Sequence, residues 1–230
     1  MTAKIISAEV VAIKSLNSDV VSYQLYPSEA VDFDPGQYLQ LIIEDVDYSY
    51  SIANAPREDN FLELHIRHST KNSSNEKVLA KLRHGSRLNI RMPLGECSLQ
   101  NFSSQNPLLF IAVGLGFVPI KSILEYLFAN GCDLPLQLYW GARAENDVYY
   151  DDILRIWQEQ NSNFRYNPII YADQKQRLIE TVLSDNAAVI ADYNIVLCGP
   201  FEFIYALRDN LVAAGVPKEH LFSDAFSFES

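Results

Sequence analysis

The organisation of this 230-residue chain is decided by residues 108–120, whose sequence is LLFIAVGLGFVPI. Its first six residues are an unbroken apolar run, which is typical of a strand buried on both faces of a parallel sheet. Two glycines follow, and the apolar pattern after them predicts a helix over residues 119–129. Glycines between such a strand and helix let the backbone approach a phosphate, and the helix N-terminus offers free N–H groups. The two glycines by themselves would also fit a simple tight turn. The phosphate-binding interpretation depends on their position, between the end of a buried strand and the start of a helix.

The residues after this turn alternate between strand-like and helix-like segments. The expected strands cover residues 136–139, 165–171 and 194–198, and the further helices cover residues 151–160, 176–183 and 201–214. This alternation predicts a parallel sheet with helices on both faces. Cys198-Gly199-Pro200 ends the last strand. Ligands of open α/β sheets bind at the carboxyl ends of strands, so this loop and the glycine loop are expected to line one crevice. A buried cysteine beside a Gly-Pro turn is the alternative.

The residues before the turn predict a different architecture. Short segments rich in β-branched and aromatic residues are bounded by turns such as Asp34-Pro35-Gly36; they cover residues 4–13, 20–26, 38–43, 50–53, 62–67 and 87–92. Six antiparallel strands at this spacing predict a small closed barrel, because closure removes exposed edges. A capping-box pattern at Ser73–Glu76 predicts one helix that ends before Gly85. We expect two domains, residues 1–103 and 104–230, joined by the polar segment 101–107.

Composition and charge exclude several classes of protein. The hydrophobic content of 48% with 20% charged residues is typical of a globular protein. The net charge is −11: the first domain has 10 basic and 13 acidic residues (−3), the second 8 and 16 (−8). Neither domain offers the basic surface that nucleic acids require, so small molecules or a basic protein are the expected partners.

Cysteine usage and the N-terminal residues indicate a compartment. Cys97, Cys132 and Cys198 form no CxxC motif and no disulfide framework, which predicts a cytoplasmic protein without an iron–sulfur cluster or metal site. No apolar run reaches the length of a membrane span, and the N-terminal residues enter a strand pattern without a signal-peptide core.

Five motifs in order carry a resemblance that covers nearly the whole chain. They are Pro35-Gly36-Gln37-Tyr38, Tyr50-Ser51-Ile52-Ala53-Asn54, the Gly-x-Gly-x-x-Pro turn, Leu138-Tyr139-Trp140-Gly141-Ala142-Arg143 and Cys198-Gly199-Pro200. The series resembles the ferredoxin–NADP⁺ reductase superfamily. The ending Leu221-Phe222-Ser223-Asp224-Ala225-Phe226-Ser227-Phe228 is similar to that of NAD(P)H:flavin oxidoreductases, including the flavin reductases of luminous bacteria.

The resemblance implies a flavin site on the barrel. Tyr50 is implied to lie against the isoalloxazine ring, and Ser51, the catalytic candidate, to hydrogen-bond near flavin N5, the hydride acceptor. A strand with one face in the core is the alternative for this pair. The implied flavin-side residues are Gln37, Tyr38, Tyr50, Ser51, Ile52, His65 and Ile66. A lone histidine on a barrel strand is more often structural, so both interpretations of His65 remain open.

The resemblance also implies a nicotinamide nucleotide site on the α/β domain. The glycine turn would hold the pyrophosphate, the Cys198 loop would lie near the nicotinamide, and Phe226 would shield the flavin. The implied residues are Gly114, Gly116, Phe117, Pro119, Arg143, Cys198, Gly199, Pro200 and Phe226. The choice between NADH and NADPH stays open, because Arg143, Lys175 and Arg177 suit a 2′-phosphate but suit solvated surface positions equally.

Departures from the family pattern keep three functions open. Tyr48 replaces the arginine that pairs with the FAD pyrophosphate in members that retain FAD; Arg57, Arg67 and Arg91 are candidate substitutes. Val113, Leu115 and Val118 are bulkier than usual around the glycine turn. We expect a hydride transfer from NAD(P)H to riboflavin, FMN or FAD. The alternatives are a reductase that holds FAD and feeds a protein electron acceptor, and a non-catalytic flavin- or nucleotide-binding member.

Overall fold

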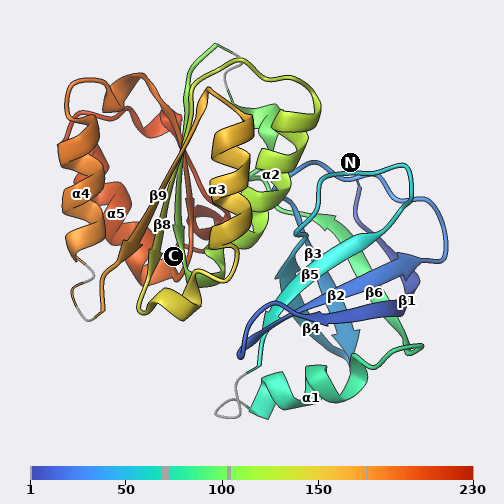
Figure 1. Cartoon of the computed structure of the whole chain (residues 1–230). Helices are drawn as coiled ribbons and strands as arrows, with labels where there is room; N and C mark the ends of the chain where they lie inside the picture. Colours follow the sequence, from blue (N-terminus) through green and yellow to red (C-terminus); the bar gives the residue numbers. More distant parts are fainter. Residues whose placement is uncertain (1, 69–72, 103–104, 173, 175, 230) are drawn as a thin grey trace. The chain divides into compact units, whose positions relative to one another are not determined.

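The computed structural model describes residues 2–68, 73–102, 105–172, 174 and 176–229, and it contains two compact units (Figure 1). The first unit comprises residues 1–100 together with Lys121–Leu127, and the second comprises Asn101–Ile120 and Phe128–Ser230. Helix α2 (Phe117–Ala129) is therefore divided, because its central residues group with the first unit.

The first unit is built on one antiparallel sheet of six strands, as the sequence predicts. The strands are β1 (Lys4–Ser15), β2 (Val20–Pro27), β3 (Tyr38–Ile43), β4 (Val46–Ser51), β5 (Leu62–Arg67) and β6 (Arg87–Leu94), in the order β4-β3-β6-β1-β2-β5. The sheet curls strongly in Figure 1. Its hydrogen-bonded ladder ends at β4 and β5 in the described residues, so the expected closed barrel is a curled sheet with two edges. Beyond the end of β4, Ala53 N donates to Glu63 O at 2.7 Å.

The strand expected over residues 50–53 is wrong in its bounds, since β4 runs from Val46 to Ser51. The cause is a two-residue hairpin turn whose central residues, Glu44 and Asp45, have φ of 52° and 61°. Two left-handed residues in succession give the turn whose twist matches antiparallel strands. Neither residue is a glycine, so the usual sequence signal for this hairpin is missing.

The register of β3 with β4 decides which side chains face the core. Leu39 and Leu41 are fully buried, and their partners Tyr50 and Tyr48 on β4 pack against the same core. Ser51 pairs with Tyr38, so it lies on the opposite face of the sheet from Tyr50.

Helix α1 (Ser73–Lys81) covers part of this core, since Val78 is fully buried in it. The predicted capping box of Ser73 lies outside the residues whose side chains the structure describes.

The second unit contains a parallel sheet of five strands, as the alternating pattern predicts. The strands are β7 (Leu108–Val113), β8 (Leu136–Ala142), β9 (Phe164–Ile170), β10 (Asn194–Cys198) and β11 (Leu221–Phe222), in the order β11-β10-β7-β8-β9. Helices lie on both faces of the sheet in Figure 1, and besides α2 they are α3 (Asp151–Gln160), α4 (Gln176–Asn186) and α5 (Phe201–Ala213). The two-residue strand β11 was not predicted, because it is too short to show a pattern.

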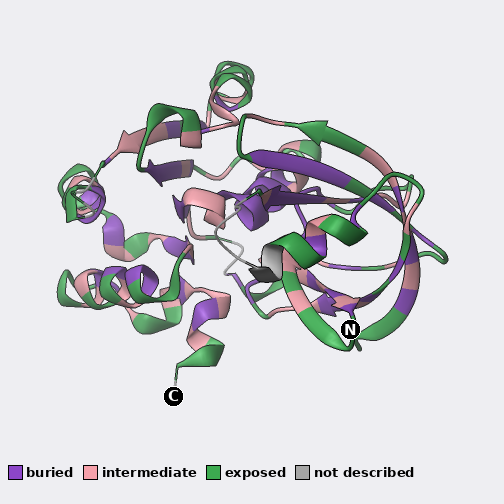
Figure 2. Ribbon diagram, turned by 90° about the horizontal axis from the view of Figure 1, so that it is seen from below, coloured by how far each residue is buried: buried purple, intermediate pink, exposed green. Residues whose placement is uncertain are grey.

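Short 3₁₀ helices join these elements. They are η1 (Leu99–Asn101), η2 (Gly114–Gly116), η3 (Glu145–Asp147), η4 (Ile190–Asp192), η5 (Lys218–His220) and η6 (Asp224–Phe228). Figure 2 shows buried residues concentrated on the strands and on the inner sides of the helices. Within the described ranges, no helix combines the length and the apolar character needed to cross a membrane.

Candidate functional site

The end of β4 presents an aromatic ring and a hydroxyl group on its two faces. Burial raises the pKa of Tyr50 to about 12, and the neighbouring Tyr48 and Tyr23 add to the shift. A tyrosine phenol is already neutral at ordinary pH, and this shift keeps Tyr50 neutral to higher pH still. Its ring offers a half-buried, uncharged surface suited to stacking. Ser51 is half-buried, and its hydroxyl group makes no hydrogen bond with any residue that the structure describes. A hydroxyl group in that state is available to a bound molecule.

Three of the other predicted flavin-side residues have their side chains engaged in the fold. The Gln37 amide accepts from Asp34 N at 2.8 Å and donates to Gly95 O at 3.2 Å, so it stabilises the turn before β3. The side chains of Ile52 and Ile66 lie in the core, with exposed fractions of 0% and 1%. Tyr38 is half-buried and shares the face of Ser51. If Gln37, Ile52 and Ile66 contact a flavin as predicted, they would therefore do so through their main-chain atoms.

His65 belongs to a buried polar cluster on the outer face of β5. Its Nε2 lies 3.1 Å from Glu63 Oε1, which also accepts from Ser22 Oγ at 2.7 Å. The second oxygen of Glu63 pairs with Lys121 Nζ at 3.0 Å. The sequence analysis missed Glu63 and Lys121, although a lysine inside the apolar helix FVPIKSILEYLFA was a signal.

Burial and charge determine the protonation of this cluster. Burial lowers the pKa of His65, against the pull of Glu63, and favours the neutral imidazole. Burial would raise the pKa of Glu63, but hydrogen bonds from His65 and Ser22 and the charge of Lys121 hold it well below its usual value. The His65 side chain is fully enclosed. These contacts support the structural interpretation of His65.

In the second unit, the glycine turn and the Cys198 loop abut closely. A Cβ atom on Gly116 would lie 1.9 Å from the carbonyl oxygen of Cys198, and one on Gly199 would lie 2.9 Å from Val113 Cβ. The loops follow β7 and β10, which are neighbours in the sheet. The expected single crevice thus corresponds to two adjoining loops at the carboxyl ends of adjacent strands. Nothing lies within 4 Å of a Cβ built on Gly114, which leaves open space beside that backbone.

Buried aromatic residues pack against the glycine turn and hydrogen-bond to it. Phe117 is fully buried and stacks on Trp140, with ring centroids 4.2 Å apart. Trp140 Nε1 donates to Gly114 O at 2.9 Å. Helix α2 starts at Phe117, two residues before the predicted start, and the buried Pro119 lies in its first turn. The Phe117 ring is therefore engaged in the fold, and a nucleotide contact would come from its backbone.

The remaining nucleotide-side predictions lie at the ends of strands and in the C-terminal segment. Arg143 follows β8 and is exposed, and Pro200 is exposed before α5. Phe226 packs against the core of the second unit, and the Arg208 guanidinium lies 5.5 Å from its ring centre. Lys175 lies outside the described residues. The sequence analysis missed an exposed stacked pair, Phe201 and Phe228, whose ring centroids are 5.4 Å apart.

Two of the arginines considered as substitutes at Tyr48 have acidic partners. Arg91 donates to Gln40 Oε1 at 2.7 Å and forms a short ion pair with Asp47, the residue before Tyr48. Arg57 pairs with Asp59 at 2.6 Å. A phosphate at either arginine would compete with a carboxylate already in place.

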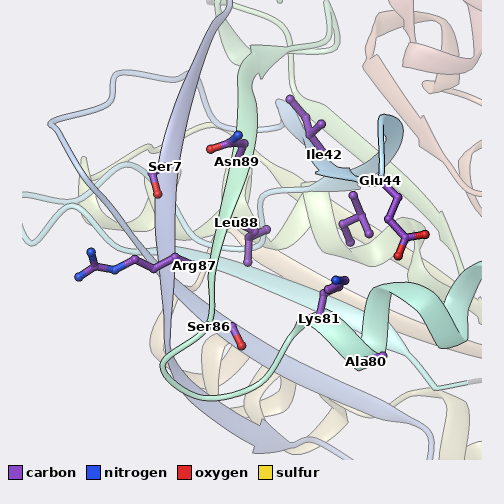
Figure 3. A pocket seen from close by; sticks show the side chains of 10 residues that line it. Ser7, Ile42, Glu44, Ala80, Lys81, Ser86, Arg87, Leu88 and Asn89 are labelled. Atoms are coloured by element: carbon purple, nitrogen blue, oxygen red, sulfur yellow. The ribbon is translucent and has the colours of Figure 1, made fainter.

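A hollow of about 560 Å³ lies elsewhere in the first unit, between α1 and strands β1, β3 and β6 (Figure 3). Its lining residues are Ser7, Ile42, Ile43, Glu44, Ala80, Lys81, Ser86, Arg87, Leu88 and Asn89. None of them belongs to the five motifs. Arg87 points away from the hollow in Figure 3 and pairs with Glu9 at 3.0 Å. No group of three metal-ligating side chains occurs in the described part of the chain.

Comparisons with known proteins match both units. Residues 7–99 match the oxidoreductase FAD-binding domain model, and residues 110–209 match the oxidoreductase NAD-binding domain model. The chain is 31% identical to a probable flavin reductase of Vibrio harveyi, over 94% of this chain and 97% of that protein. It is 30% identical to the NAD(P)H-flavin reductase of Aliivibrio fischeri, over 97% and 99% of the two chains.

Some relatives are longer than this chain. The CDP-6-deoxy-L-threo-D-glycero-4-hexulose-3-dehydrase reductase of Yersinia pestis is 29% identical, and the match covers 90% of this chain but 64% of that protein. The ferredoxin reductase in carbazole 1,9a-dioxygenase superposes with a TM-score of 0.83 at 24% identity, covering 98% of this chain and 70% of the other. This structural likeness concerns the fold.

The abutting loops make a specific prediction about Gly116. We expect Gly116→Ala to lower the free energy of unfolding by about 3 kcal/mol, because its Cβ would meet backbone that cannot rotate away. Gly131→Ala is the control: its φ is 63° with open space around it, so we expect a loss of about 1 kcal/mol. Urea unfolding of both variants measures the difference. Equal losses would show that the two loops do not abut.

The polar cluster predicts how stability depends on pH. Because the folded-state pKa of Glu63 is lowered, its stabilisation is fully present above the ordinary pKa of 4.5 and is lost as the pH falls below it. We expect the stability difference between wild type and Glu63→Gln, measured by urea unfolding, to shrink from pH 7 to pH 4. Glu9→Gln removes an exposed carboxylate paired with Arg87 and should show little difference at either pH. A constant difference for Glu63→Gln would contradict the assigned ionisation.

Proposed function

This chain belongs to the flavin reductases of the ferredoxin–NADP⁺ reductase superfamily, and from that premise we propose that it transfers a hydride from NADH or NADPH to N5 of a flavin. Residues 1–103 would bind the flavin, as riboflavin, FMN or FAD, and residues 104–230 the nicotinamide nucleotide. The observation that carries the proposal is that adjacent residues at the end of β4 present the Tyr50 ring on one face and, on the other, the Ser51 hydroxyl group, which has no hydrogen-bond partner among the described residues.

The residues present fit both cofactors. Gly114 leaves open space beside its backbone in η2, the turn that leads into α2, and the N–H groups at the start of a helix favour a phosphate. Tyr50 offers an uncharged aromatic face, which suits a flavin ring. When bound, the flavin supplies the hydride-accepting atom N5.

The chain's own contribution would be binding and alignment. Ser51 would donate a hydrogen bond to the atom that gains electron density, and the glycine turn would hold the nucleotide phosphates through its backbone. His65 is enclosed and neutral, so it supplies no proton in this scheme. Most of the rate enhancement would come from aligning the nicotinamide ring with the isoalloxazine ring.

An electron-transfer reductase with resident FAD is the second candidate. The chain is 29% identical to the reductase component of the naphthalene 1,2-dioxygenase system of Pseudomonas putida, over 97% of this chain and 70% of that protein. Tyr48 and the pairing of Arg91 with Asp47 weigh against tight FAD retention, since neither leaves a free cation for the pyrophosphate. Under this second candidate function, the reduced FAD would pass its electrons to a separate protein acceptor.

A non-catalytic member is the third candidate, motivated by Tyr48, Val113 and Leu115. The glycine turn keeps its abutment on the Cys198 loop despite the two bulky residues, which favours catalysis. We propose a cytoplasmic location, because Cys97, Cys132 and Cys198 form no disulfide bond within the described residues.

Anaerobic absorbance of the purified, desalted protein tests the proposal. We expect a colourless protein that bleaches excess added flavin when NADH or NADPH is present, which identifies flavin as a substrate. A yellow protein bleached by NAD(P)H alone would establish the second candidate. Folded protein that bleaches no flavin would establish the third.

Ser51→Ala tests the residue on which the mechanism depends. We expect the turnover number to fall roughly 10- to 100-fold, as for loss of a hydrogen bond to a charged group, with little change in unfolding temperature. Ser49→Ala is the matched control, since Ser49 lies two residues earlier on the same face of β4 and is exposed. The turnover numbers of both variants are measured by steady-state kinetics, and we expect Ser49→Ala to match wild type. Wild-type turnover in Ser51→Ala would remove the assigned role.

A further inference from the structure

We propose that Lys121 is a positioning residue for the flavin site: together with Ser122 and Glu125, it fixes the main chain that follows Ser51. The inference rests on the proposed flavin site and adds a second set of residues to it. None of the three side chains belongs to the motifs that carry the family resemblance.

Lys121 holds its ammonium group in a buried, fully bonded position. The residue is 1% exposed, and Nζ donates to Ala53 O at 3.0 Å, Glu63 Oε2 at 3.0 Å and Glu125 Oε1 at 2.7 Å. An ammonium group has three protons, so these acceptors satisfy it. The Ala53 carbonyl lies two residues beyond Ser51.

The neighbouring residues of the same helical turn bind the next two peptide groups. Ser122 Oγ donates to Asn54 O at 2.7 Å, and Glu125 Oε2 accepts from Ala55 N at 3.0 Å. One turn of α2 therefore binds three successive residues of the segment 53–55. All these partners lie within the first unit.

The opposite side of this segment is also bound. Ile52 N donates to Gln37 O at 3.0 Å, and Ala53 N donates to Glu63 O at 2.7 Å. Asn54 Oδ1 accepts from Glu63 N at 2.7 Å. The segment is therefore held by hydrogen bonds to Gln37 (the residue before β3), to β5 and to α2. These bonds fix the main chain that follows Ser51.

Stability alone does not account for a buried charge at this position. Stripping water from an ammonium and two carboxylates is costly, and apolar replacements of buried ion pairs are often as stable as the original. A methionine could fill the volume of Lys121, but it could not hold a carbonyl and two carboxylates at fixed positions. What the charge provides is the defined geometry of residues 53–55.

The experiment measures flavin affinity separately from nucleotide use. Lys121→Met, Ser122→Ala and the control Lys77→Met are prepared; Lys77 is an exposed lysine of α1, 3.7 Å from Glu44. The dissociation constant of FMN or FAD, whichever wild type reduces faster, is measured by quenching of flavin fluorescence. The KM for NADH or NADPH is measured in the same preparations.

We expect the flavin dissociation constant to rise roughly 3- to 10-fold in Ser122→Ala and at least about 10-fold in Lys121→Met, in line with the loss of one neutral bond and of several charged ones. The KM for the nucleotide should change less than about twofold, and Lys77→Met should match wild type in both. If Lys121→Met does not fold, Ser122→Ala decides by the same criteria.

Two results would overturn the inference while leaving the proposed function intact. One is a folded Ser122→Ala variant with wild-type flavin affinity. The other is an equal rise of the flavin dissociation constant and the nucleotide KM, which would indicate general loosening. A wild-type protein that binds no flavin would instead overturn the proposed function, and this inference with it.

Discussion

The hydrogen bonds of the Lys121 ammonium group are the interaction on which the position of the segment 53–55 in the first unit depends. The ammonium group is buried in a largely apolar helix and bonded to a backbone carbonyl and two carboxylates. Its contacts explain why residues 121–127 group with the first unit although they follow the first strand of the second. A charge buried with its partners cannot slide along a surface, because every shift would leave a carboxylate unpaired.

The second unit depends on a steric constraint instead. Gly116 and Gly199 occupy positions where a side chain would collide with the neighbouring loop, so the glycine turn and the Cys198 loop lie against each other with backbone almost touching backbone. Phe117 stacks on the buried Trp140 ring, and Trp140 donates a hydrogen bond to Gly114 O. These two contacts stabilise the glycine turn.

The two half-sites differ in how much of their chemistry lies in side chains. On the flavin side, Tyr50 and Ser51 present a ring and a hydroxyl group, while Gln37, Ile52 and Ile66 are engaged in the fold. On the nucleotide side, the glycine turn presents backbone, and the Phe117 ring is enclosed. Motif residues therefore divide into those whose side chains are available to a ligand and those whose side chains are engaged in the fold.

The sequence by itself determined the fold class and the order of the main elements, and its motifs supplied the proposed locations of both candidate half-sites. Apolar runs and alternation report burial directly, so β3, β5, β7, α3 and β10 have the predicted bounds, and the motifs marked the ends of β4, β7 and β10. The hairpin at Glu44 and Asp45 was not predicted, because its two left-handed residues are not glycines. Only the tertiary structure decided which motif side chains are available and which charges are buried together. Glu63 and Lys121 are 58 residues apart, and nothing local to either one reports that their partner lies 3.0 Å away. The close approach of Gly116 to Cys198 likewise spans separate strands, and such contacts are set by the packing of whole elements rather than by local sequence.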